Sequence, residues 1–197
     1  MDKPTVDDPA ARGTPQPRYV VNNVKKTATE CCDDGLAFDS GINPSGIAHV
    51  DMWFGRAGTK QHYKEEVHGA LLRIHLTFGD DFTTQGQICR DDPVIKKRGF
   101  GVRFLIGRGD EIRKVTIWSG DYFVYGIQFH TANGIVSPIY GEMQNISKTT
   151  EICLAQDETI LGVYGRWTYS PDALSAVGFT TGKVHSAHDF TKATVAA

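Results

Sequence analysis

One strand pattern occurs three times in this chain, and it constrains the fold more than any other feature of the sequence. Each copy has an isoleucine followed three positions later by a valine: Ile47 and Val50, Ile112 and Val115, and Ile160 and Val163. In the second and third copies an acid stands two positions before the isoleucine, as Asp110 and Glu158. Repetition of this kind predicts one structural unit that is used three times.

A second strand completes a hairpin in each copy. It ends in an aliphatic residue, one intervening residue and a phenylalanine, in the steps Leu76-x-Phe78, Ile127-x-Phe129 and Val177-x-Phe179. Turn-forming residues lie between the two strands, and short links of this kind favour antiparallel pairing. Because one hairpin cannot bury its apolar face alone, we expect three hairpins around a shared core. The alternative is chance similarity among the strands of a β-sandwich.

The sequence predicts one domain with a tail at each end. Residues 1–30 are expected to form a flexible arm, because they contain too little apolar surface to offset the entropy lost on ordering. Their prolines are Pro4, Pro9, Pro15 and Pro17. The domain is expected at residues 31–190 and a short tail at 191–197. A chain of 197 residues is long enough for one substantial core.

Charge and composition exclude several classes of function. A net charge of -2 gives no positive field for nucleic-acid phosphates, so no nucleic-acid partner is expected. Apolar runs are too short for a transmembrane segment. The first residues lack the basic start and apolar stretch of a secretory signal, which predicts a cytoplasmic location, with non-classical export as the alternative. The spacing of Cys31, Cys32, Cys89 and Cys153 fits no metal site, so reduced thiols and no metal or other cofactor are expected.

Catalytic motifs are missing from the sequence. It contains no Gly-x-Ser-x-Gly, no His-Glu-x-x-His and no glycine-rich phosphate loop. The sequence therefore predicts a recognition protein rather than an enzyme.

The three-copy pattern resembles the jacalin-related lectins, whose β-prism contains three Greek keys related by pseudo-threefold symmetry. Three segments carry the resemblance in the order of the family: residues 35–50 are similar to its opening, residues 110–141 to its middle key and residues 162–166 to the start of its third key. The similarity covers roughly residues 33–190. It implies an all-β prism of three Greek-key repeats that binds a carbohydrate or glycoprotein without catalysis.

In that family a Gly-x-x-x-Asp loop of the third key holds the sugar, together with backbone amides of the opening glycine-rich segment. The resemblance places the opening at Gly35. An ungapped count then puts Asp172 at the acidic position and Thr168 at the glycine. Alignment on the internal repeat instead puts Ser175 at the acidic position and Pro171 at the glycine, and both registers remain open. A carboxylate suits the task because it accepts hydrogen bonds from two sugar hydroxyls.

Aromatic side chains near this loop are further candidates. Trp167 and Tyr169 are expected to stack on the sugar ring. Asp121 and Tyr122 occupy the equivalent loop of the second key and are predicted to form a second, weaker site. In a lectin, assembly into a homo-oligomer would supply avidity. The alternative function is a non-catalytic assembly subunit that uses the prism for protein contacts, with residues 1–30 reaching a neighbour.

Overall fold

The computed structural model describes residues 19–27, 30–31, 35–57, 67–79, 99–168 and 173–186. All regular elements in these residues are strands, as the sequence predicts. The strands are β1 Tyr19–Lys26, β2 Glu30–Cys31, β3 Leu36–Asp39, β4 Ile47–Ala57, β5 Val67–Phe78, β6 Gly99–Leu105, β7 Ile112–Ser119, β8 Val124–Thr131, β9 Tyr140–Gly141, β10 Lys148–Cys153, β11 Thr159–Trp167 and β12 Leu174–Ser186. This part of the chain holds no helix that is long and apolar enough to cross a membrane.

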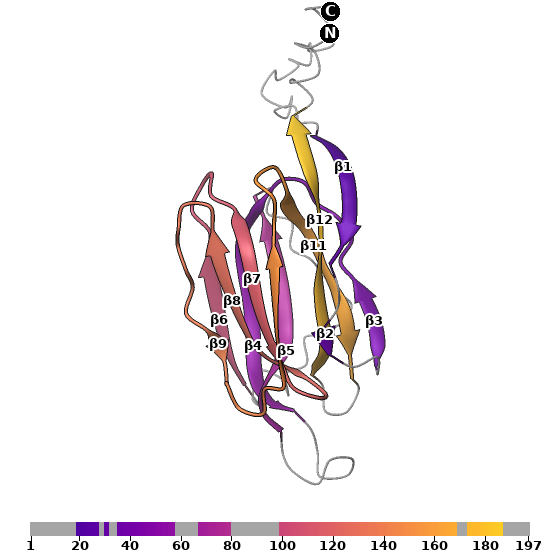
Figure 1. Ribbon diagram of the computed structural model, residues 1–197, viewed down its shortest axis with the longest axis vertical. Helices are drawn as coiled ribbons and strands as arrows, with labels where there is room; N and C mark the ends of the chain where they lie inside the picture. The colour runs from indigo at the N-terminus through magenta and orange to yellow at the C-terminus, as the bar shows by residue number, and fades with distance from the viewer. Residues whose placement is uncertain are drawn as a thin grey trace, which may run out of the picture.

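Three antiparallel sheets surround one interior. One sheet has the order β1-β12-β11-β3, with β2 also paired to β12; the second has the order β10-β7-β8-β9; the third has the order β5-β4-β6. Figure 1 shows the strands running along the long axis of the molecule, with β1 and the last part of β12 rising together at one end. Each sheet contains one of the predicted hairpins, namely β11–β12, β7–β8 or β4–β5.

The three hairpins share two irregularities at the same positions. Pairing in each first strand skips the residue directly after the isoleucine of the repeat, which is Ala48, Arg113 or Leu161. Pairing in each second strand skips one residue near the hairpin loop, which is Leu72, Tyr125 or Ser175. A β-bulge is a specific local feature of a strand pair. Two bulges in the same places in all three hairpins therefore identify them as copies of one unit.

The pairing corrects one detail of the predicted repeat. The valine of each copy has one cross-strand partner, in the pairs Val50–Leu76, Val115–Phe129 and Val163–Phe179. Leu76 is therefore the equivalent of the two phenylalanines, and the predicted step Leu76-x-Phe78 lies two residues too far along. The true equivalent is Ile74-x-Leu76. Phe78 fits the sequence pattern because it is a buried phenylalanine, like Phe129 and Phe179. In the structure it pairs with Ile47 and not with the valine of its repeat.

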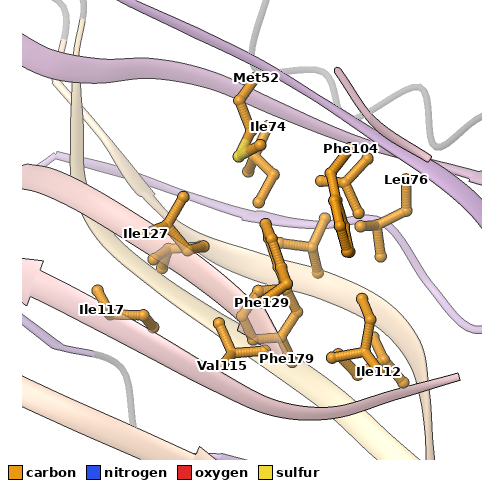
Figure 2. Packing of buried hydrophobic residues seen from close by; sticks show 14 of the residues in the cluster. Met52, Ile74, Leu76, Phe104, Ile112, Val115, Ile117, Ile127, Phe129 and Phe179 are labelled. Carbon is orange, nitrogen blue, oxygen red and sulfur yellow. The ribbon is translucent and has the colours of Figure 1, made fainter. Parts of the chain in front are cut away.

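Inward-facing side chains of all three hairpins form one hydrophobic core, part of which is shown in Figure 2. Phe129 and Phe104 stack at its centre, with ring centroids 5.4 Å apart and planes at 7°. Phe129 and Phe179 are fully buried. Complete burial of such a side chain stabilises the fold by about 1.5–3 kcal/mol. This core holds the three sheets together as a prism.

The predicted flexible arm is wrong for part of its length, because residues 19–26 form β1. This strand pairs with β12 from Tyr19 opposite Ser186 to Lys26 opposite Thr180. Most of its side chains are exposed, so the segment has no buried apolar face of its own. Its order comes from the backbone hydrogen bonds to β12. Residues 1–18 and the predicted tail at 191–197 lie outside the described part of the chain.

Candidate functional site

The ends of the three hairpins next to their loops meet at one end of the prism. The residues two positions before the bulge of each second strand are Ala70, Phe123 and Ala173. All three are fully buried and belong to one hydrophobic cluster, together with the bulge residues Leu72 and Tyr125. This cluster is separate from the main core. The ends of all three hairpins next to their loops are therefore packed beside one another.

The opening segment lies against the third hairpin at this end. Leu36 pairs with Trp167, and Gly35 directly before it has a φ of +104°. A Cβ at Gly35 would lie 2.4 Å from the carbonyl oxygen of Trp167, so only glycine fits here. Arg166 Nη1 donates a hydrogen bond to the Gly35 carbonyl at 3.0 Å. The structure thus brings together the opening segment and the base of the third-key loop, the two segments to which the resemblance assigns sugar binding.

The sequence did not predict a second glycine at which a Cβ would clash with the carbonyl of a neighbouring strand. Gly99 precedes Phe100, which pairs with Phe54 as Leu36 pairs with Trp167. A Cβ at Gly99 would lie 2.2 Å from the Phe54 carbonyl oxygen. The available signal was a glycine at the start of the outer strand in both repeats, directly before β3 and as the first residue of β6.

The base of the third-key loop is closed by Thr168. Its backbone N–H and its hydroxyl both donate to the carbonyl of Ala173, at 3.0 and 3.2 Å. Trp167 is partly buried and packs against the main core. These contacts hold Trp167 in place at the end of β11, and its stacking on a sugar ring stays a prediction.

The two alignment registers have different outcomes. Ser175 is fully buried at the bulge of β12, so its hydroxyl does not reach the surface in this structure. The bulge turns this position into the interior, as it does for Leu72 and Tyr125 in the other repeats. Asp172 and Tyr169 lie outside the described residues, and their roles stay predictions. The register that uses Asp172 is the one that remains compatible with a surface site.

The loop of the second key is a tight turn at the same end. The N–H of Gly120 donates to the carbonyl of Phe123 at 3.0 Å, and the buried Phe123 ring anchors the turn. Asp121 is exposed, and so is Tyr122, whose ring centroid lies 6.4 Å from that of Phe123. The pairing shows that the hairpins of the second and third keys are equivalent. A contact of Asp121 or Tyr122 with sugar stays a prediction.

An ion pair ties the opening segment to β1. Lys26 Nζ lies 2.6 Å from Asp39 Oδ2, and the Gly41 N–H donates to Asp39 Oδ1 at 2.9 Å. The hydrogen bond from Lys26 lowers the pKa of Asp39, and burial opposes it only in part. Both side chains are substantially exposed, so the pair contributes about 1 kcal/mol at most.

Cysteines and acids offer no metal centre in the described residues, where no group of three or more His, Cys, Asp or Glu is placed to hold a metal ion. Cys153 is a free, exposed thiol. The side chains of Cys31, Cys32 and Cys89 lie outside the described part of the chain.

Comparison with known proteins identifies the class that this prism defines. The family model of the jacalin-like lectin domain matches residues 96–195, so the chain belongs to this family. No curated protein matches the sequence.

Solved lectins share the fold. Artocarpin in complex with mannotriose is 16% identical over 81% of this chain and 98% of its own, with a TM-score of 0.58. Frutapin from Artocarpus incisa is 15% identical over 83% of this chain and 99% of its own, with a TM-score of 0.59. A mannose-specific jacalin-related lectin from Morus nigra, in complex with mannose, is 17% identical over 87% of this chain and 98% of its own, with a TM-score of 0.54. At this identity the comparisons establish the β-prism fold.

Proposed function

We propose that this protein binds a mono- or oligosaccharide through the loop end of its prism and has no catalytic role. The observation that carries the proposal is the close approach of the Gly35 backbone to Trp167, beside the loop that starts at Thr168. Membership of the jacalin-like lectin domain family supports it. So does the fold shared with artocarpin and with the Morus nigra lectin, which were solved with mannose-containing ligands.

The proposed site combines a few polar groups with apolar surface. Backbone N–H groups near Gly35 and the carboxylate of Asp172 would hold the hydroxyls on one edge of a sugar. Leu36 and Tyr122 are about half exposed at the same end and offer apolar surface to the C–H face of the ring. Such a shallow site binds one sugar weakly, and several sites in an oligomer would raise the avidity.

A glycan array tests the proposal with the wild type and two variants. Asp172→Ala removes the proposed ligand, whereas Asp157→Ala removes an exposed acid in the turn before β11, away from the hairpin loops. The wild type and Asp157→Ala are expected to bind the same glycans, and Asp172→Ala is expected to lose them. Absence of wild-type binding, or equal binding by Asp172→Ala, would count against this function.

A second candidate function is assembly through protein contacts, and one surface feature favours it. Ile135, Val136, Ile139 and Met143 are each between 43% and 51% exposed on the segment that joins β8 to β10. Exposed apolar groups gathered on one segment are typical of interaction surfaces. Light scattering on the double variant Ile135→Ser/Ile139→Ser tests this role: a lower mass than the wild type is expected, and an unchanged mass would contradict it.

A further inference from the structure

A pocket of about 290 Å³ lies away from the hairpin loops, between the sheet that contains β1 and β12 and the end of β10. Lys25 lines it from β1, Thr27 lines it directly after that strand, and Thr181 lines it from β12. Thr150 and Ile152 line it from β10, and Glu158 closes it from the turn before β11. The pocket is thus built by residues of two sheets and is separate from the loop end described above.

Two hydroxyl groups in the lining of this pocket are buried and have no hydrogen-bond partner. Thr181 is only 1% exposed, and its hydroxyl oxygen has no hydrogen-bond partner. The buried hydroxyl oxygen of Thr150 also has none. Burying a hydroxyl without a partner is unfavourable, and buried polar groups in native proteins are almost always bonded to protein, water or ligand. Two such hydroxyls in the lining of one pocket indicate an occupant that forms hydrogen bonds.

The equivalent place in the second repeat is filled by the chain itself. Thr131 is the counterpart of Thr181, since each pairs with the isoleucine that opens its repeat. The Thr131 hydroxyl accepts a hydrogen bond from the Ile135 N–H at 3.2 Å. Asp110, the counterpart of Glu158, accepts from the Asn133 N–H at 3.1 Å. A local loop therefore supplies partners for the Thr131 hydroxyl and for Asp110 Oδ1, whereas the buried Asp110 Oδ2 has no partner.

The third repeat departs from this arrangement. Glu158 is 8% exposed and accepts a hydrogen bond from the Ala155 N–H at 3.2 Å, and its other oxygen lies 2.6 Å from Lys25 Nζ. Lys25 comes from β1, at the other end of the sequence. Within the described residues no loop reaches Thr181, and the pocket lies in that place.

Charge and shape indicate which ligand suits the pocket. The Lys25–Glu158 pair is neutral as a unit, and a charged ligand would disturb this pair and leave a buried charge without compensation. Ile152 and Leu154 give the pocket an apolar side. Its volume lies at the lower end of the range for small-molecule sites. We propose that the pocket binds a small, neutral compound with neighbouring hydroxyls, which is either a sugar unit or a free polyol.

A titration followed by two-dimensional ¹⁵N–¹H NMR tests this second site, because it reports each end of the prism separately. Methyl α-mannoside represents a sugar unit and myo-inositol represents a free polyol. Saturable shifts are expected at the amides of Lys25, Thr150 and Thr181 with at least one probe. A response to methyl α-mannoside alone identifies a sugar site, and a response to myo-inositol identifies a polyol site. Shifts at Gly35 and Thr168 report the loop end instead.

Two matched variants complete the test. Thr150→Val/Thr181→Val keeps the shape of both side chains and removes both hydroxyls, and about 10-fold weaker binding is expected. Thr150→Ser/Thr181→Ser keeps the hydroxyls and is expected to bind as the wild type does. The proposal is overturned if neither probe shifts these amides, if shifts appear only at the loop end, or if the valine variant binds as well as the wild type. Binding at the loop end is unaffected by any of these outcomes.

Discussion

Ser137 in the second repeat and Thr27 in the third occupy the same structural position. The Ser137 hydroxyl accepts a hydrogen bond from the Phe129 N–H, and the Thr27 hydroxyl accepts one from the Phe179 N–H, both at 3.0 Å. The N–H of each residue also donates to the carbonyl of the same phenylalanine. In the second repeat this segment follows its hairpin directly. In the third repeat it comes from the N-terminal part of the chain, which therefore completes the repeat formed by β11 and β12.

Removing either hydroxyl is expected to destabilise the protein to a similar extent. Ser137→Ala and Thr27→Val each leave a phenylalanine N–H without its side-chain partner, at a cost of about 1–2 kcal/mol. Thermal unfolding should then occur about 2–4 °C lower per kcal/mol lost. Ser137→Thr and Thr27→Ser keep the hydroxyl and serve as controls. Unchanged melting temperatures in the first two variants would contradict the equivalence of the two positions.

Alanine substitutions at two glycines with a left-handed backbone compare the cost of a steric clash with the cost of backbone strain alone. Gly41 has a φ of +73° and open space where a Cβ would be, whereas at Gly35 a Cβ would meet the Trp167 carbonyl. Gly41→Ala should cost about 1–2 kcal/mol of backbone strain. Gly35→Ala should cost more, because the backbone of β11 must also move. Urea unfolding of both variants measures the difference, and equal losses would show that the contact with Trp167 relaxes freely.

Stability should fall in acid through the carboxylate of Glu158. The hydrogen bond from Lys25 lowers the pKa of Glu158 from its ordinary 4.5, against the opposing effect of burial. A lowered folded-state pKa gives stability that is present above the unfolded value and is lost as the pH falls through the folded value. The free energy of unfolding should therefore decline below about pH 4.5.

Glu158→Gln isolates this contribution. Urea unfolding at several pH values between neutral and acid should give a shallower decline for Glu158→Gln than for the wild type. The other groups whose pKa is lowered, such as Asp39, remain in both proteins and account for the rest of the decline. If the free energy of unfolding declines equally with pH in the two proteins, Glu158 does not contribute to the loss of stability in acid.

The core prediction concerns Phe129. Its ring is fully buried and stacks on Phe104, so Phe129→Ala should cost about 3–5 kcal/mol of folding free energy. Phe100 is half exposed on the outer strand β6, and Phe100→Ala should cost far less. Denaturant unfolding of both variants gives the comparison. Similar losses would mean that the core is not centred on Phe129.

Much of the fold was predictable from the inward-facing residues of the repeat. In each copy one residue is skipped between the isoleucine and the valine, so both side chains pack in the core although they stand three positions apart. A spacing of three therefore marks the same distorted strand in all three hairpins. Strand β1 was not predictable in this way, because its partner β12 orders it through the backbone. Its own sequence, YVVNNVKK, contains two asparagines and two lysines and no regular alternation.

The candidate site was predictable only in part, because backbone irregularities decide which of its residues reach the surface. Gly35 was found because the resemblance places the glycine-rich opening of the family there. Ser175 was placed at the acidic position by alignment on the internal repeat, and the structure buries it at the bulge of β12, which the sequence pattern does not reveal. Gly99 would have been found by comparing the residues at which the outer strands of the repeats start.

Isothermal titration calorimetry with a glycan selected on the array tests the central claim most directly. The titration compares the wild type with Gly35→Ala and Gly41→Ala, under conditions where thermal melting shows all three to be folded. Because a Cβ at Gly35 would meet the Trp167 carbonyl whereas a Cβ at Gly41 would stand in open space, Gly41→Ala should bind as the wild type does. Gly35→Ala should bind at least about 10-fold more weakly, which is a loss of about 1.4 kcal/mol. Equal affinity of all three proteins would contradict a sugar site at the loop end of the prism.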